Sequence, residues 1–369
     1  MSLSISLPPF AFWLTFPCAP SGRKRVSACI PVVAPPANLR RPFGTEFGKH
    51  FFLKSIDSIH RRQLALEAIE LWRGEPATLR HVSDSENHVF SFIASGKNRF
   101  LRLTSSRHRT VFQIEAELDF VRHLHQGGVS VSLPLTSLNG LAVEKMEIAN
   151  HAFCACVFEE AEGESFAFDS HVPNLKHFRL RGRTLGRIHA LARKHKPSAS
   201  LCRFAWDEDD CLLNAERYLP RSESVVWDEY YHLMEWLHGH PKDVYSFGLI
   251  HGDFGATNYR YHNDCLSVFD FDDCCYHWFA YDLAITIYPH GWRKEAQALL
   301  ESLLEGYSEE ASWRTDSTAD LIDFCRLRLL YMFLTYAKKW GFSDLSDQQA
   351  NWFAQKRENI ARGYKLNGL

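Results

Sequence analysis

Apolar and polar positions in the first half of the chain switch between helical and strand-like spacing. Apolar residues from Leu64 to Trp72 recur at the spacing of one helix face, and Gly74 follows them. Short apolar runs flanked by turn residues come next, which predicts a small sheet with one long helix inserted. The expected elements are a helix that ends by Gly74, strands at 89–93 and 99–104, a helix at 111–125, and strands at 141–148 and 153–159.

The second half of the chain has a mostly helical pattern. From about Asn174 apolar residues recur three and four positions apart, and the first of these helices is expected to end near His195. A short β-rich insert at 247–271 interrupts the helices. These patterns predict an α+β chain with a small β-rich N-lobe and a larger, mostly helical C-lobe. The further helices are expected at 225–238, 295–307, 319–339 and 348–364.

The first 45 residues differ in composition from the rest of the chain. They hold eight of the fifteen prolines and five basic residues, and the first acidic residue is Glu46. Proline at this density blocks helices and sheet ladders, so we expect a disordered leader with order beginning near Phe51. An acid-free leader is typical of an organelle transit peptide. The alternatives are a flexible tail and a translation start site that is placed too far upstream. We therefore divide the chain into a leader at 1–50, an N-lobe at 51–160 and a C-lobe at 161–369.

The composition excludes several classes of protein. The formal net charge is −2, so a globally basic nucleic-acid-binding protein is not expected. The sequence lacks the roughly 18 consecutive apolar residues of a membrane-spanning helix. Ten cysteines include no Cys-x-x-Cys pair, which argues against a zinc ribbon. Their irregular scatter in so large a chain favours a reducing compartment, so we expect a cytoplasmic protein, or an imported one if the leader is a transit peptide. His189 has no further metal ligand nearby and is expected to be structural.

The β-rich insert carries the densest group of chemically active side chains. An apolar run delivers His-Gly-Asp at 251–253, and Asn258 follows five positions after Asp253. A predicted hairpin then leads to Asp-Phe-Asp-Asp at 270–273. A loop and a hairpin of this length can bring Asp253, Asn258 and Asp270 together around one point. Three oxygen donors there suit Mg²⁺, and Asp272 is a further candidate ligand.

The spacing of these residues resembles the catalytic segment of the aminoglycoside phosphotransferase and choline kinase family, whose kinase-like fold phosphorylates hydroxyl groups of small molecules. The resemblance implies that Asp253 is the catalytic base, that Asn258 binds Mg²⁺ and that Asp270 is the principal Mg²⁺ ligand. Asp282 would be structural and would hold the catalytic loop. Gly252 stands where protein kinases commonly have arginine. The implied architecture is a two-lobed, protein-kinase-like α+β fold over about residues 51–364.

A kinase-like fold also needs an N-lobe cation that binds the ATP phosphates and a helix carboxylate that positions this cation. Arg102 lies between Leu101 and Leu103, so strand alternation places its side chain on the opposite face from theirs. An arginine can bind phosphate oxygens bidentately. Glu117 on the next helix is its expected partner, and Glu115 is the alternative.

The remaining expected nucleotide contacts come from a turn and a hinge. The chain has neither a glycine-rich phosphate loop nor a Walker A pattern, but residues 83–88 can form a turn whose backbone N–H groups and Ser85 hydroxyl face phosphate. Glu159 and Ala161 lie where the hinge of the family binds adenine through backbone groups. The expected cofactors are therefore ATP and Mg²⁺, with the nucleotide bound by the N-lobe and the catalytic loop and acceptor site carried by the C-lobe.

The resemblance implies that the acceptor binds among the C-terminal helices. Residues 206–230 contain eight acidic residues that would attract an amine, and nearby aromatic residues would supply cation–π contacts. The alternative, which we favour, is a solvated acidic loop beside a packed aromatic helix. The aromatic residues are Trp227, Tyr230, Tyr231 and Trp236.

The predicted function is ATP- and Mg²⁺-dependent transfer of phosphate to a hydroxyl group of a small molecule, such as an aminoglycoside, an amino alcohol or a homoserine-like compound. No nucleic acid or membrane is expected as a partner. One alternative is a bacterial-type Ser/Thr protein kinase on the same scaffold, although the short separation of Asp270 and Asp282 leaves little room for an activation segment. A nucleotide-binding pseudokinase without turnover is the other alternative.

Overall fold

The computed structural model describes residues 57–165, 174–198, 200–313 and 318–367. All of them belong to one unit, Ser55–Leu369. The expected leader at 1–50 and the expected start of order near Phe51 lie outside the described residues. Within the described part, no helix combines the length and the apolar character that crossing a membrane requires.

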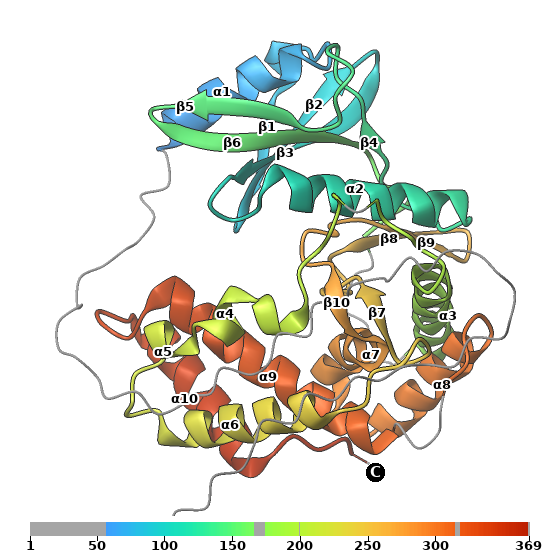
Figure 1. Ribbon diagram of the computed structural model, residues 1–369, viewed down its shortest axis with the longest axis vertical. Coiled ribbons are helices and arrows are strands. Elements are labelled where there is room, and N and C mark those ends of the chain that lie inside the picture. The colour runs from blue at the N-terminus through green and yellow to red at the C-terminus, as the bar shows by residue number, and fades with distance from the viewer. Residues whose placement is uncertain (1–56, 166–173, 199, 314–317, 368–369) are drawn as a thin grey trace, which may run out of the picture. The chain divides into compact units, whose positions relative to one another are not determined.

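A six-stranded antiparallel sheet forms the N-lobe (Figure 1). The strands follow the order β1-β2-β3-β6-β4, and β5 also pairs with β6. The hairpin expected from the sequence is confirmed as β2 and β3, and β3 pairs with β6 on its other side. The strands span Arg80–Asp84 (β1), Asn87–Ala94 (β2), Lys97–Ser105 (β3), Pro134–Leu135 (β4), Glu144–Ile148 (β5) and His151–Glu159 (β6).

Two helices cover opposite faces of this sheet (Figure 1). Alternate residues of β6 point to opposite faces of the sheet. Phe153, Ala155 and Val157 enter the core under the first helix. Cys154 and Cys156 point the other way and pack against the apolar face of the second helix. The central strand β6 is therefore buried on both sides. The helices span Ser58–Glu70 (α1) and Val111–Gln126 (α2).

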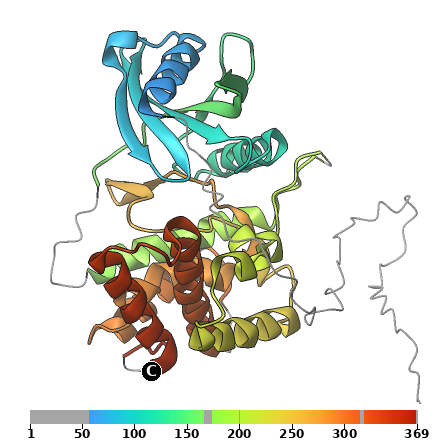
Figure 2. The same cartoon turned by 90° about the vertical axis from the view of Figure 1, so that its left-hand side faces the viewer.

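Helices make up most of the C-lobe. Two of them, α3 and α8, pack with their backbones in direct contact, because a Cβ atom at Gly182 would overlap the carbonyl group of Leu303, and one at Gly306 would overlap that of Arg179. Figure 2 shows α9 and α10 as neighbours at the lower left of that view. The α-helices span Leu175–Ala192 (α3), Asp210–Leu213 (α4), Ala215–Tyr218 (α5), Ser224–Gly239 (α6), Phe279–Ile287 (α7), Ala296–Ser308 (α8), Thr318–Trp340 (α9) and Asp347–Arg362 (α10), and short 3₁₀ turns span Pro76–Thr78, Trp206–Glu208 and Tyr288–His290.

Two short two-stranded antiparallel sheets lie in the C-lobe, and of these only β8 and β9 form a hairpin. Strand β7 pairs with β10, and β8 pairs with β9. The turn between β8 and β9 is formed by Asn263 and Asp264, both with positive φ (48° and 58°), which is the backbone of a type I′ turn. This hairpin and its turn are as the sequence predicts. The strands span Phe247–Ile250 (β7), Tyr259–His262 (β8), Cys265–Val268 (β9) and Cys275–Trp278 (β10).

The expected α+β class, with a β-rich N-lobe and a mostly helical C-lobe, is confirmed. Three local expectations are corrected. Residues 83–88 do not form one turn, because Ser83 and Asp84 belong to β1 and only Ser85 and Glu86 lie between the strands. The β-rich insert extends past residue 271 through β10, which continues directly into α7. The helix that follows Asn174 ends at Ala192 rather than near His195.

Candidate active site

The segment after β7 forms a tight loop that presents Asp253. Gly252 has φ +84°, and a Cβ atom there would overlap the backbone carbonyl of Asp273. Glycine is therefore required both for the left-handed backbone and for the close approach of the two loops. His251 is fully buried beside them, and its ring accepts a hydrogen bond from the Asp253 N–H (3.2 Å). The loop is thus fixed from both sides of Gly252.

Asp282 on α7 anchors this loop through its backbone. Its carboxylate accepts the backbone N–H groups of His251 (2.8 Å) and Gly252 (2.9 Å), and the ring of His189 (3.0 Å). Burial acts to raise the pKa of Asp282, but the hydrogen bond and charge of His189 outweigh it and hold the pKa below its usual range. His189 contacts the Tyr307 hydroxyl through its other ring nitrogen (3.0 Å), so the expected structural histidine is confirmed. Asp282 sits where a loop-holding carboxylate was expected.

Asp282→Asn is expected to lower the free energy of unfolding by about 3–5 kcal/mol, because the amide replaces a fully buried acceptor and leaves donors unpaired. Urea denaturation followed by circular dichroism measures this change. Asp264→Asn is the matched control, since Asp264 lies on an exposed turn and pairs with Lys176 in solvent. A wild-type unfolding curve for Asp282→Asn would contradict the anchoring role.

Asp253 and Asn258 are in direct contact. The amide of Asn258 donates both to the backbone carbonyl of Asp253 (2.8 Å) and to its Oδ2 (3.0 Å). The other carboxylate oxygen of Asp253 accepts from Nη2 of Arg328 at 2.6 Å. Arg328 lies on α9 and was not predicted as a site residue, because no local motif marks it.

The second acidic stretch lies against the catalytic loop. The backbone N–H of Phe269 donates to the carbonyl of Asn258 (3.0 Å), and the ring of His251 contacts the carbonyl of Phe269 (3.1 Å). Asp270 follows directly with φ +63°. Asp270 is exposed at the surface, but nearby protein reduces the solvation of its carboxylate. This loss of solvation, with the charges of neighbouring carboxylates that include Asp253, raises its pKa to about 6 against the opposing charge of Arg102. The structure thus places Asp253, Asn258 and Asp270 together.

The carboxylate of Asp272 contacts residues of the N-lobe. Its Oδ2 lies 2.8 Å from Nε2 of His108, and the guanidinium groups of Arg102 and Arg109 lie 3.9 and 3.8 Å from its carboxylate oxygens. Burial acts to raise the pKa of Asp272, but the hydrogen bond with His108 and the two arginine charges hold the pKa below its usual range. Glu86, His108 and Asp272 could together hold a metal ion by geometry. The two guanidinium groups oppose a cation there, so Asp272 joins the lobes instead.

Arg102 and Glu117 form a bidentate ion pair under the sheet. Nη1 and Nη2 of Arg102 donate to the two carboxylate oxygens of Glu117 at 2.8 and 2.7 Å, and both side chains are buried. Burial acts to lower the pKa of Arg102, but the charges of Glu117 and Asp272 raise it well above its ordinary value. The face of β3 follows the alternation expected from its sequence, and Glu117, rather than Glu115, is the partner. The capping box of Thr110 and Gln113 fixes the start of α2 and hence the position of Glu117.

The other expected nucleotide contacts lie at the rim of the N-lobe. Ser85 is exposed in the turn between β1 and β2. Glu159 ends β6, where its side chain pairs with Arg99 (3.2 Å) and its N–H donates to Leu133 (2.9 Å). Ala161 is half-buried two residues later, where the chain leaves the sheet.

Three of the eight acidic residues at 206–230 pair with cations of this chain. Glu223 pairs with Arg357, Glu229 with Arg326, and Asp210 with Lys338. The expected aromatic residues pack among themselves and against the core, as the favoured alternative states. Trp227 stacks on Tyr231, Trp236 contacts Phe324, and the hydroxyl of Tyr230 donates to the Leu212 carbonyl.

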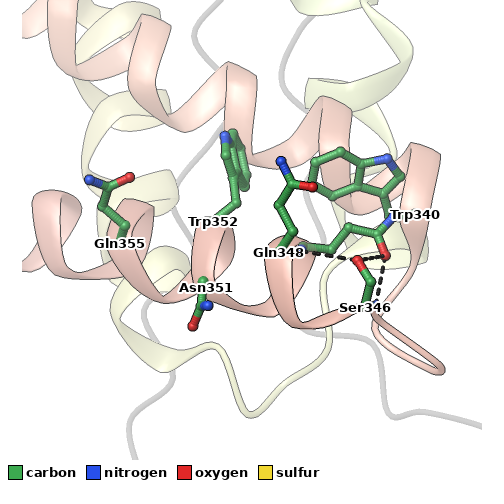
Figure 3. A pocket seen from close by; sticks show the side chains of 7 residues that line it. Trp340, Ser346, Gln348, Asn351, Trp352 and Gln355 are labelled. Atoms are coloured by element: carbon green, nitrogen blue, oxygen red, sulfur yellow. Dashed lines mark hydrogen bonds between the residues drawn. The ribbon is translucent and has the colours of Figure 1, made fainter.

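A surface pocket of about 720 Å³ lies at the end of α9 and the start of α10, apart from the residues of the candidate active site. Figure 3 shows Gln348, Trp352 and Gln355 on one side of α10, with Trp340 beside them and Asn351 turned away. None of the described residues expected at the site lines this pocket. The chemistry of the loop around Asp253 is therefore independent of it.

Comparison with known proteins gives a consistent picture. The profile of a family described as the phosphotransferase enzyme family matches residues 78–317. Amicoumacin kinase of Bacillus subtilis (strain 168) is 28% identical over 328 residues, which cover 86% of this chain and 97% of the relative. A protein of Salmonella typhimurium named serine/threonine protein kinase RdoA is 23% identical over 268 residues, 71% of this chain and 78% of the relative.

Solved structures show the same fold. An amicoumacin kinase in complex with AMP-PNP, Ca²⁺ and Ami superposes with a TM-score of 0.78 at 27% identity, covering 84% of this chain and 97% of the other. A microcompartment-associated aminopropanol kinase superposes with a TM-score of 0.68 at 21% identity, covering 81% and 95%. The expected kinase-like, two-lobed fold is therefore confirmed.

Proposed function

The chain belongs to the phosphotransferase enzyme family, and on that premise we propose that it transfers the γ-phosphoryl group of ATP, with Mg²⁺, to a hydroxyl group of a small molecule. The observation that carries the proposal is the contact of Asn258 with both Asp253 and the backbone that leads into Asp270. This contact gathers a candidate base and two further oxygen donors in one place. Phosphoryl transfer needs a group that orients the nucleophile, together with donors that hold a metal ion near the phosphates.

In the proposed reaction Asp253 orients the acceptor hydroxyl and accepts its proton. The hydroxyl oxygen forms a bond to the γ-phosphorus while the bond from that phosphorus to the β–γ bridging oxygen breaks, and ADP leaves. The buried ring of His251 keeps the loop in place, since it contacts both the Asp253 N–H and the carbonyl of Phe269. These contacts hold the base still while the phosphoryl group moves.

Asn258 and Asp270 are the proposed Mg²⁺ ligands, and the fit rests on charge as well as position. Reduced solvation raises the pKa of Asp270 to about 6, although the charge of Arg102 opposes the shift, and a divalent cation bound there would favour the ionised carboxylate. When bound, Mg²⁺ neutralises charge on the phosphates. Arg102, held by Glu117, is the proposed phosphate-binding cation. Ser85 is proposed at the phosphate turn, and the backbone of Glu159 and Ala161 at the adenine.

The acceptor is proposed to be a small molecule, as the names of the amicoumacin and aminopropanol kinases suggest. An amino alcohol is the proposed class. The acidic segment supports it only weakly, because its members Glu223, Glu229 and Asp210 already pair with cations of this chain. The proposed function therefore requires only that the acceptor has a hydroxyl group. That the acceptor also carries an amine stays a prediction.

A protein substrate is the second candidate, because one relative is named as a serine/threonine protein kinase. The short segment between Asp270 and Asp282, much of it β10, leaves little room for a peptide-docking activation segment. A small-molecule acceptor is therefore preferred.

The test is a screen of the purified protein with Mg-ATP against fractionated metabolites, amicoumacin, aminopropanol and homoserine. ADP release together with a phosphorylated product identified by mass spectrometry supports the proposal. Phosphate incorporated only into a general protein substrate such as casein would favour the protein kinase. Binding of Mg-AMP-PNP without ATP consumption in any arm would favour the pseudokinase.

A further inference from the structure

The carboxylate of Asp253 accepts a hydrogen bond on each of its two oxygens. Nη2 of Arg328 donates to Oδ1 at 2.6 Å, and Nδ2 of Asn258 donates to Oδ2 at 3.0 Å. Arg328 comes from the middle of α9, 75 positions further along the chain. Building on the proposed function, we propose that Arg328 is a positioning residue that fixes the orientation of the Asp253 carboxylate toward the acceptor hydroxyl.

The geometry of the pair suits orientation rather than blockage. A hydrogen bond between two ionised groups is short and roughly twice as strong as a neutral one, so it resists rotation of the carboxylate about its Cβ–Cγ bond. Each carboxylate oxygen has more than one lone pair, so a hydroxyl can still bind to Asp253 while Arg328 and Asn258 stay in place. Without Arg328, only the neutral amide of Asn258 would define the direction of the carboxylate.

Arg328 is itself held in place. Its side chain is 18% exposed, and the buried phenol of Tyr281 on α7 and the half-buried phenol of Tyr331 on α9 lie beside it. Tyr331 is fixed in turn, because its hydroxyl donates to Asp209 at 3.1 Å. Burial acts to lower the pKa of Arg328, but the charge of Asp253 outweighs this effect and raises the pKa above its ordinary value. The guanidinium therefore keeps its charge. The residue therefore offers a fixed cation at a fixed place.

The same helix supplies a matched control. Arg326 lies two positions before Arg328 and forms its own bidentate pair with Glu229, at 2.8 and 2.6 Å. That pair lies between α9 and α6 and shares no partner with Asp253. Arg326 also pairs with Asp323 on the same helix (2.6 Å). Arg326→Met therefore removes one guanidinium and its two ion pairs from this helix, and neither partner contacts Asp253.

The experiment compares Arg328→Met, Arg328→Lys and Arg326→Met with the wild-type protein. Turnover is measured with the acceptor found by the screen, and also as slow hydrolysis of Mg-ATP, in which water is the nucleophile. We expect Arg328→Met to lower kcat about 100-fold. Arg328→Lys is expected to lower kcat about tenfold, because lysine retains the positive charge but not the planar guanidinium. Arg326→Met is expected to change kcat less than about twofold. The Kd for Mg-AMP-PNP is expected to stay within about threefold of wild type in all three.

The outcomes separate the inference from the function on which it rests. A wild-type protein that turns over no ATP in either assay would overturn the proposed function. An active wild-type protein with wild-type kcat in Arg328→Met would overturn the positioning role alone. An equal loss in Arg326→Met, or a loss of Mg-AMP-PNP binding in parallel with kcat, would also overturn it, since either result indicates a disturbed helix. A thermal unfolding curve for each variant identifies misfolding, and in that case Arg328→Lys carries the comparison.

Discussion

Asp253→Asn is expected to lower kcat by about 10³-fold and to leave the Kd for Mg-AMP-PNP within about threefold of wild type. The amide has nearly the shape of the carboxylate but cannot take up a proton, and its NH₂ group cannot accept the hydrogen bond that Arg328 or Asn258 donates to that side. The loss therefore falls on the transfer step. Single-turnover assays with the identified acceptor, together with nucleotide titration, separate the two quantities.

Asp264→Asn is the control for this substitution. Asp264 lies in the β8–β9 turn of the same segment, is exposed and pairs with Lys176. It should keep wild-type turnover. Wild-type transfer by Asp253→Asn would contradict the assignment of the base, and equal losses of transfer and of nucleotide binding would indicate a disordered loop instead.

The elements that carry a clear period were predictable from the sequence, and those without one were not. The alternation around Arg102 gave its face of β3 correctly, because one side of that strand lies under α1 and the other under α2. Helix α7 was missed because all nine of its residues are buried, so no polar face marks a helical period. Strand β10 was also missed, because it is only four residues long and continues directly into α7.

The site divides in the same way. Asp253, Asn258 and Asp270 lie within one short stretch of chain, so their spacing and the intervening hairpin indicate where they meet. Arg328 reaches Asp253 across 75 positions, and His108 reaches Asp272 across 164. Contacts at such separations depend on how α9 and the N-lobe pack, and no local pattern encodes that. The contact of Asp272 with His108 could not be predicted from the sequence for the same reason.

Asp270→Asn has the second large expected effect, a fall in Mg-AMP-PNP affinity of about 100-fold with phosphoryl transfer reduced at least as much. Asparagine tolerates the left-handed backbone at this position, where φ is +63°, so the substitution removes charge without straining the loop. A neutral amide is a far weaker ligand for Mg²⁺ than a carboxylate. Isothermal titration with Mg-AMP-PNP at pH 8 measures the affinity.

The stability of the metal-free protein provides the second readout for Asp270→Asn. Reduced solvation and the nearby carboxylates raise the pKa of Asp270 from its ordinary value of 3.8 to about 6, although Arg102 opposes the shift. A carboxyl group whose pKa is higher in the folded than in the unfolded protein favours folding while it is protonated, and this contribution is lost as the pH rises through about 6. Asparagine cannot ionise, so at pH 8 the metal-free variant should have a Tm equal to or above that of wild type.

The combination of weaker Mg-nucleotide binding with an undiminished Tm distinguishes a metal ligand from a residue that only supports the fold. Asp344→Asn is the matched control, because Asp344 is an exposed aspartate with the same left-handed backbone (φ 58°) and lies far along the chain from the catalytic loop. It should change neither quantity. Unchanged Mg-AMP-PNP affinity in Asp270→Asn would remove Asp270 from the metal site, and a lowered Tm at pH 8 would show that its carboxylate stabilises the loop.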